Sequence, residues 1–247
     1  MTKKLNLNYS NNLYLDVYLP INDNYKTIIY FHGGGLCSGD KTDPQYLNIA
    51  EQFVNNGYCF VSVNYSLYPA AKFPIYICDC ANAIKYVFNN VKTWGGSEDI
   101  YVAGQSAGAW IALMLCCNKE YLINIGVDPL DVKGWISDSA QTTSHFNVIS
   151  REDGLSNLCQ RIDEKAPLYF LNPEFKSNPI LLIYYQDDMP NRLQQNELFY
   201  SSIKSFNRNI DIQKIMLSGC HCHGSSFANI DGTFDFVNVS LDWLVEH

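Results

Sequence analysis

Gly104-Gln105-Ser106-Ala107-Gly108 directly follows Ile100-Tyr101-Val102-Ala103, a short apolar run that is typical of a buried β-strand. Its two glycines suit a turn so tight that side chains at their positions would collide with the neighbouring backbone. A serine between them, where a strand turns into a helix, is a candidate nucleophile. Small and polar residues cluster in many turns, so the motif needs support from elsewhere in the chain.

A glycine loop upstream gives that support. His32-Gly33-Gly34-Gly35 follows residues 27–31, whose β-branched and apolar side chains predict another buried strand. Glycines leave backbone N–H groups bare, and such donors can hold the oxyanion that forms when a serine attacks an acyl carbonyl. Each donor contributes about 2.7 to 4 kcal/mol in that role. We expect the N–H groups of Gly34, Gly35 and Ala107 to form an oxyanion hole.

The two motifs together resemble those of the α/β-hydrolase superfamily, specifically its hormone-sensitive-lipase-like and small carbohydrate-esterase group. There, HGGG supplies the oxyanion hole and GxSAG the nucleophile. Residues 61–69 are similar to that group's VxVxYxxxP stretch, and Ala166-Pro167-Leu168 to the segment before its penultimate core strand. The resemblance covers nearly the whole chain. It implies an α/β-hydrolase fold, with a mostly parallel central sheet and helices on both faces.

The order of patterns along the chain agrees with such a fold, because strand-like runs alternate with apolar stripes at helical spacing. No linker, repeat or charge run divides the chain, so we expect a single domain over residues 1–247. Only 31 residues precede His32, and most are typical of an antiparallel edge hairpin, so little or no cap domain is expected. The predicted strands lie near residues 13–19, 26–31, 58–64, 100–104, 133–138, 179–185 and 210–217.

A catalytic serine needs a histidine base, and the base needs a carboxylate to orient it. In this fold the chain order is serine, then acid, then histidine. The acid is expected after the penultimate strand, which ends in Asp187-Asp188. We favour Asp188, because its distance to Gln195-Asn196 is similar to the family's spacing into the following helix. A shift of one residue in the turn would select Asp187 instead.

Two histidines follow the last predicted strand, in Gly219-Cys220-His221-Cys222-His223-Gly224. Family members commonly show a GxGHG pattern here, which neither histidine matches in full. His223 precedes a glycine, as the family's histidine does, so His223 is the favoured base. Gly219 lies nearer the spacing expected before His221, which is the alternative base. His145 comes before the acid in the chain, which argues against it as the base.

The cysteines of the same cluster raise the question of a metal site. Cys78 and Cys80, like Cys220 and Cys222, are separated by a single residue, whereas structural zinc sites use two or more. We therefore expect no metal and no other cofactor. Nine cysteines, an odd number scattered through apparent core segments, predict reduced thiols. With no signal-peptide pattern at the N-terminus, the expected location is cytoplasmic, unless an export signal has been removed.

A formal net charge of −8 argues against nucleic acid or an anionic membrane as a partner. The expected partner is a small-molecule ester that is neutral or whose charge is masked, and nothing in the sequence sets an oligomeric state. Residues 139–176 are expected to form a small lid or insertion, with His145, Phe146, Tyr169 and Phe170 among the residues that roof the pocket. So small a roof suits short acyl groups better than long lipid chains.

The resemblance therefore implies a serine carboxylesterase that hydrolyses short-chain acyl esters, among them acetyl or feruloyl esters of sugars, through an acyl-enzyme. An arylformamidase is the alternative within enzymes, because that group shares the fold, an HGG-type loop and the triad. A non-catalytic small-molecule receptor on the same fold is the alternative of another class. Such receptors keep the serine and lose the histidine, whereas this chain has histidines near the expected place.

Overall fold

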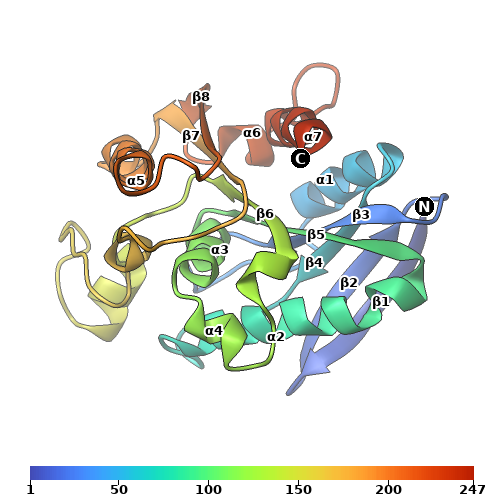
Figure 1. Cartoon of the computed structure of the whole chain (residues 1–247), viewed down its shortest axis with the longest axis horizontal. Helices are drawn as coiled ribbons and strands as arrows, with labels where there is room; N and C mark the ends of the chain where they lie inside the picture. Colours follow the sequence, from blue (N-terminus) through green and yellow to red (C-terminus); the bar gives the residue numbers. More distant parts are fainter.

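An eight-stranded sheet runs through the centre of the computed structural model, which describes residues 1–247 (Figure 1). Its spatial order is β1-β2-β4-β3-β5-β6-β7-β8. Strand β2 is antiparallel to β1 and to β4, and all other pairs are parallel. The strands are β1 (Thr2–Ser10), β2 (Leu13–Leu19), β3 (Tyr25–Phe31), β4 (Cys59–Val63), β5 (Gly96–Gln105), β6 (Val132–Asp138), β7 (Ile180–Asp187) and β8 (Ile212–Cys220).

Helices cover both faces of this sheet, which confirms the predicted α/β-hydrolase architecture. On one face, α1 (Pro44–Asn55) and α7 (Asp235–Glu246) pack on the sheet around Tyr30 and Phe60. On the other, α2 (Ile75–Asn90), α3 (Ala107–Cys117) and α5 (Arg192–Phe206) share the larger apolar core. In Figure 1, α1 and α7 lie above the sheet and α2 lies below it.

Short helical segments complete the fold. The α-helical ones are α4 (Glu120–Ile123) and α6 (His223–Ser226), and 3₁₀ turns lie at Val91–Trp94, Pro129–Asp131 and Pro167–Phe170. A π-helical turn spans Val148–Glu152. No helix is both long enough and apolar enough to span a membrane.

The predicted strands correspond to β2 to β8, and the largest differences lie at their ends. Strand β5 begins at Gly96, before the predicted residue 100, and β8 continues to Cys220, beyond the predicted residue 217. The expected N-terminal hairpin is present as the antiparallel pair β1 and β2. Every residue of β4 is buried, as expected for a strand covered on both faces by helices.

Helix α3 explains how the candidate nucleophile is held at the centre of the molecule. All of its residues from Ala107 to Cys117 are buried, so the helix has no solvent-facing side. A helix that is apolar all round lies within the core. The turn that carries Ser106 between β5 and α3 is therefore anchored at both ends by buried elements.

Residues 139–176, the expected lid or insertion, connect β6 to β7. The first part, Ser139–His145, is buried, whereas residues 154–158 are exposed. The segment is tied to neighbouring loops, since Asn147 Nδ2 donates to the carbonyl of Gly35 at 2.6 Å and the amide of Phe73 donates to Glu152 at 2.9 Å. It is therefore packed onto the edge of the fold rather than set apart from it.

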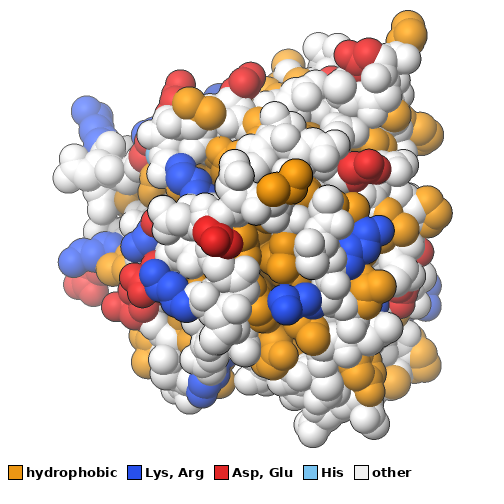
Figure 2. Space-filling model, turned by 90° about the vertical axis from the view of Figure 1, so that its right-hand side faces the viewer, with side chains coloured by type: hydrophobic (Ala, Val, Ile, Leu, Met, Phe, Trp, Pro, Cys, Tyr) orange, Lys and Arg blue, Asp and Glu red, His pale blue; other side chains and the backbone are white.

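The face that includes the β1 and β2 side of the molecule mixes acidic, basic and apolar side chains (Figure 2). Lysine and arginine side chains occur there singly or in small groups, beside aspartate and glutamate. The view contains no continuous basic surface.

Candidate active site

Ser106 lies at the tip of the turn from β5 to α3 with backbone angles φ 52° and ψ −111°. A non-glycine residue rarely adopts a positive φ, and such strained residues cluster at active sites. Close packing requires both glycines of the motif. A Cβ on Gly104 would lie 2.4 Å from the carbonyl carbon of Gly108, and a Cβ on Gly108 would lie 2.1 Å from the carbonyl oxygen of Phe31.

Three side chains from three separate connections meet at this turn. The hydroxyl of Ser106 lies 2.8 Å from Nε2 of His221, and Nδ1 of His221 lies 2.5 Å from Oδ1 of Asp188. The carboxylate of Asp188 is 1% exposed, whereas the ring of His221 is 24% exposed. This is the geometry in which an imidazole, oriented by a buried carboxylate, can remove the proton of a serine hydroxyl.

The structure brings His221, the alternative base, to Ser106, and does not bring His223, the favoured base, into this contact. His223 begins α6 and packs on Phe227, with ring centroids 5.1 Å apart. Its Nδ1 has only Cys220 Sγ nearby, at 3.9 Å. The physical reason is the backbone on either side of His221. Gly219 near the end of β8 (φ 110°) and Cys222 after it (φ 57°) both adopt positive φ angles, and His221 between them points toward Ser106.

The acid that the structure brings to His221 is Asp188, and Asp187 is not part of the contact. Asp187 is exposed and ends β7 opposite Cys220 of β8. Asp188 follows in the turn, where its Oδ1 also accepts the backbone N–H of Met189 at 2.6 Å. Its second oxygen, Oδ2, is buried without a hydrogen-bond partner.

The glycine loop after β3 has free donors. The backbone N–H groups of Gly34, Gly35 and Ala107 make no hydrogen bond within the protein. Gly33 differs, because its N–H donates to the hydroxyl of Tyr46 at 3.1 Å. Positive φ angles at Gly34 (106°) and Gly35 (62°) turn the loop sharply, and a Cβ on Gly34 would lie 2.0 Å from the carbonyl oxygen of Ser38. The loop therefore needs glycine there. It leaves the N–H groups of Gly34 and Gly35 unbonded, and the start of α3 adds that of Ala107.

A buried chain of hydrogen bonds joins the glycine loop, the serine turn and the histidine turn. The Tyr46 hydroxyl, which accepts the Gly33 N–H, donates to Gln105 Oε1 at 2.7 Å, and Gln105 Nε2 donates to Ser225 Oγ at 2.7 Å. Ser225 in turn donates to the carboxylate of Asp138. Burial raises the pKa of Asp138 to about 6. These hydrogen bonds could not be predicted from the sequence, because Gln105 is the variable position of its motif and Asp138 ends an apolar strand.

Other residues named from the sequence take no part in the hydrogen bonds that join Ser106, His221 and Asp188. His145 is buried against Trp110, with ring centroids 5.3 Å apart, and burial lowers its pKa well below the ordinary value. Tyr169 and Phe170 line a hollow with Cys117, at the opposite end of α3 from Ser106. Eleven helical residues span about 16 Å, so the expectation that Tyr169 and Phe170 roof the site is wrong.

The cysteines are all free. Cys80 is buried and Cys78 exposed on α2, while Cys220 is exposed at the end of β8 and Cys222 is buried just after it. No three His, Cys, Asp or Glu side chains come together as a metal-binding group.

Comparison with known proteins gives the chain a family context. A family model described as BD-FAE matches residues 15–183. Probable carboxylesterase 1 of Arabidopsis thaliana is 34% identical over 131 residues, which cover 45% of this chain and 41% of that protein. Kynurenine formamidase of Meyerozyma guilliermondii is 30% identical over 163 residues, which cover 65% of this chain and 56% of that protein. The matches thus span about half the length of these relatives.

Solved structures resemble the whole chain. A truncated form of a carbohydrate esterase from gut microbiota superposes with a TM-score of 0.80 at 17% identity, covering 100% of this chain and 96% of that one. Esterase B from Lactobacillus rhamnosis superposes with a TM-score of 0.78 at 15% identity, covering 99% and 84%. Identities this low speak for the fold, and both confirm the one expected from the sequence.

Proposed function

The chain belongs to the BD-FAE family of α/β-hydrolases, and from that premise we propose that it is a serine carboxylesterase acting on short-chain acyl esters. The observation that carries the proposal is the hydrogen-bonded series Ser106, His221 and Asp188. Its position beside three unpaired backbone N–H groups supports the same chemistry.

In the proposed reaction, Ser106 Oγ attacks the acyl carbonyl while His221 Nε2 takes the hydroxyl proton. Asp188 holds the protonated imidazole by accepting its Nδ1–H. The negative charge that develops on the carbonyl oxygen is held by the N–H groups of Gly34, Gly35 and Ala107. Collapse of this intermediate breaks the ester bond, and His221 returns the proton to the departing alcohol. Water then attacks the acyl-enzyme by the same route and releases the acid.

The substrates we propose are short acyl esters, with acetyl and feruloyl esters of sugars as the first candidates. The names of the relatives support an ester, since they include carboxylesterases and a carbohydrate esterase. The connection from β6 to β7 supports a short acyl group, because it is bonded to Gly35 and to the segment before α2 instead of forming a broad apolar lid.

An amide hydrolase is the second candidate, and one observation favours it. The Meyerozyma guilliermondii relative that matches 65% of this chain is named as a kynurenine formamidase. The same triad and oxyanion donors would serve a formamide, with an amine as the leaving group. A non-catalytic receptor has less support, since such a protein has no need of the Ser106–His221 hydrogen bond.

A substrate panel tests the proposal. We expect hydrolysis of 4-nitrophenyl acetate and butyrate, falling with longer acyl chains, and turnover of acetylated or feruloylated sugars above that of N-formylkynurenine. Ser106→Ala should remove all of it, and a fluorophosphonate should label the unmodified protein at Ser106. A Ser106→Ala protein with full activity would overturn the mechanism. Preference for the formamide would select the second candidate, and absence of both labelling and turnover would select the receptor.

A further inference from the structure

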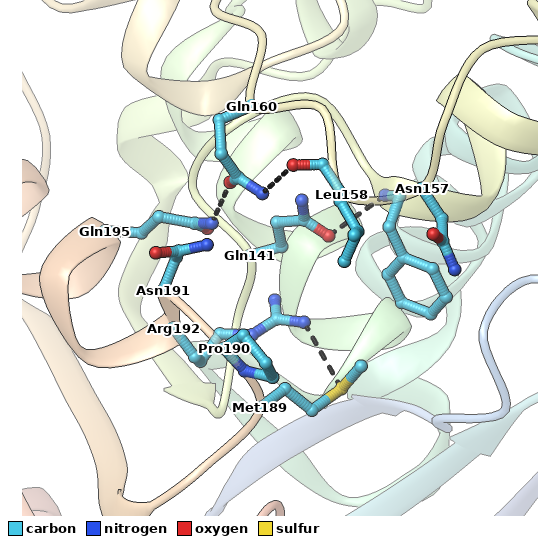
Figure 3. Close-up of a pocket in the computed structure, with 10 residues that line it drawn as sticks. Gln141, Asn157, Leu158, Gln160, Met189, Pro190, Asn191, Arg192 and Gln195 are labelled. Atoms are coloured by element: carbon cyan, nitrogen blue, oxygen red, sulfur yellow. Dashed lines mark hydrogen bonds between the residues drawn. The ribbon is translucent and has the colours of Figure 1, made fainter.

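A small cavity lies between the residues after Asp188 and the connection from β6 to β7 (Figure 3). Its volume is about 110 Å³, which is room for a group of a few non-hydrogen atoms. Two of the residues that line the cavity are neighbours of residues in the proposed site. Met189 directly follows Asp188, and Cζ of Phe146 lies 3.9 Å from the position that a Cβ would take on Gly35. No residue of the proposed triad lines the cavity, so it would receive only the far end of a substrate held at Ser106.

Arg192 is the only charged residue that lines the cavity. It begins α5, is only 3% exposed, and points its guanidinium toward the side chain of Gln141 (Figure 3). Its one hydrogen-bond contact through the side chain is to the sulfur of Met189, at 3.7 Å, and its Nε is buried without a partner. The guanidinium thus carries five N–H donors and makes no hydrogen bond to an oxygen of the protein.

Such an arrangement is costly in a folded protein. A buried charge without an ionic partner destabilises the fold, so buried arginines are normally paired with carboxylates. Asp188 is near enough to act on Arg192 electrostatically, yet the two form no ion pair. The ionic partner of Arg192 is therefore an anion that does not belong to the protein, or the positive charge of Arg192 acts on Asp188 without direct contact.

The neighbouring amides do not take up these donors. Gln141 Oε1 accepts the N–H of Phe146 at 3.0 Å, and its Nε2 donates to the carbonyl of Ser144 at 2.9 Å. Gln195 Nε2 donates to Gln160 Oε1 at 2.6 Å. The bonds of Gln195 to Gln160 and of Phe146 to Gln141 are among the dashed lines in Figure 3, so these glutamines already have partners within the protein. Arg192 is left as the charged group of the cavity that has no hydrogen bond to a protein oxygen.

We propose that Arg192 binds a carboxylate of the substrate, so that the preferred esters are those that carry a free carboxylate in addition to the ester bond. This inference rests on the proposed ester hydrolysis. A guanidinium matches a carboxylate with two parallel N–H···O bonds, which fixes orientation as well as charge. It also reconciles an anionic substrate with a chain of net charge −8, because the substrate's charge is neutralised inside the cavity.

The carboxylate could be attached to the acyl group or to the alcohol, and two pairs of test esters distinguish these sources. On the acyl side, 4-nitrophenyl hydrogen succinate is compared with 4-nitrophenyl butyrate. On the alcohol side, 4-acetoxybenzoate is compared with the neutral 4-acetoxybenzamide. We expect kcat/KM to favour the anionic member of one pair. In Arg192→Met that ratio should fall about ten- to a hundredfold, as for the loss of hydrogen bonds to a charged group, and Arg192→Lys should recover part of it.

A control variant shows whether a change in net charge alone alters the kcat/KM ratios. Arg208→Met deletes a charge from an exposed position between α5 and β8, and should leave both ratios unchanged. The proposal is overturned if the unmodified protein shows no preference in either pair. It is also overturned if Arg192→Met lowers kcat/KM equally for both members of a pair, which would mean that Arg192 acts only through Asp188.

A binding measurement keeps this inference separate from the proposed function. If no ester is hydrolysed, the proposed function fails, and carboxylate binding is then read from the thermal unfolding of Ser106→Ala. Sodium succinate should raise Tm relative to sodium chloride at equal ionic strength. The rise should be lost when Arg192→Met is added, and a rise that persists would contradict a site at Arg192. Since the comparison uses the unmodified cavity first, poor folding of an Arg192 variant would not hide a missing succinate effect.

Discussion

His221 and His223 stand two residues apart, yet only one of them contacts Ser106. We expect His221→Ala to lower kcat for 4-nitrophenyl acetate by at least about a thousandfold, because the serine then has no base. His223→Ala should stay within about tenfold of the unmodified protein. The two substitutions are matched in chemistry and location, so each controls for the other. Equal losses in both variants would contradict the assignment.

Asp138 gives the fold a pH-dependent contribution. Burial raises its pKa from an ordinary value near 4 to about 6, so the folded state favours the protonated carboxyl. The contribution of Asp138 to the free energy of unfolding is therefore greatest below about pH 4 and is lost as the pH rises through about 6. The whole change corresponds to about 3 kcal/mol.

Urea unfolding at a series of pH values tests this expectation. Asp138→Asn cannot ionise, so its stability should fall less between about pH 4 and 7 than that of the unmodified protein. Asp187→Asn, at an exposed carboxylate, serves as the control and should keep the original slope. An unchanged slope in Asp138→Asn would mean that another group causes the pH dependence.

Sequence reasoning selected Ser106 and Asp188 for the site, and the structure brings both together. It did not find the burial of Arg192, because a charged residue at the start of a helix is ordinarily solvated, and nothing local marks one that points inward. The choice between the two histidines also depends on the backbone. Gly219 and Cys222, on either side of His221, both have positive φ angles. Of the two residue types, only glycine commonly adopts such angles and so indicates them in the sequence.

Among the secondary-structure elements, the loop from β3 to α1 depends on one hydroxyl group. Tyr46 of α1 accepts the N–H of Gly33 and donates to Gln105, so it links the glycine loop to the serine turn. Tyr46→Phe leaves both partners buried and unpaired, and we expect a loss of about 1 to 3 kcal/mol in the free energy of unfolding. We also expect kcat to fall several-fold, as the oxyanion donors lose their support.

Tyr18→Phe is the matched control for this change. Tyr18 is 2% exposed and belongs to the same apolar cluster as Tyr46, but its hydroxyl makes no hydrogen bond within the protein. Denaturant unfolding and 4-nitrophenyl acetate kinetics should therefore change little in Tyr18→Phe. If Tyr46→Phe is as stable and active as this control, the loop does not depend on the hydroxyl.

The elements themselves were predictable where burial is continuous. Strands β3 and β4 are rich in apolar and β-branched residues, interrupted only by Lys26 and Ser62, and their bounds differ from the predicted ones by a single residue at the ends. The early start of β5 at Gly96 could not be predicted, because residues 96–99 are polar or small and the strand is extended there by the pairing of Gly96 with Tyr25 of β3. Tertiary pairing overrides local preference at such strand ends.

For the molecule as a whole, the N-terminal hairpin is tied to the body by a buried ion pair. Lys41 Nζ, from the loop after β3, lies 2.7 Å from Asp16 of β2 and 3.0 Å from Asn6 of β1. Both charged side chains are at most 5% exposed. Asp16→Ala leaves Lys41 buried without its partner, and we expect it to lower the free energy of unfolding by about 3 to 5 kcal/mol.

The exposed pair of Lys92 and Glu98 provides the comparison, at 3.5 Å with both side chains more than half exposed. Glu98→Ala should cost less than about 1 kcal/mol in the same urea titration. A similar small loss for Asp16→Ala would show that the hairpin is held by apolar packing alone.

The positive φ angle of Ser106 is unfavourable for stability, whereas the hydroxyl at this position is needed for the proposed chemistry. Glycine adopts such angles without steric penalty, so Ser106→Gly should relieve part of a strain of about 1 to 3 kcal/mol and raise the Tm of the fold. The same change removes the hydroxyl. Stability alone would therefore favour glycine at this position, and the unfavourable backbone of Ser106 is the cost of holding a hydroxyl 2.8 Å from His221.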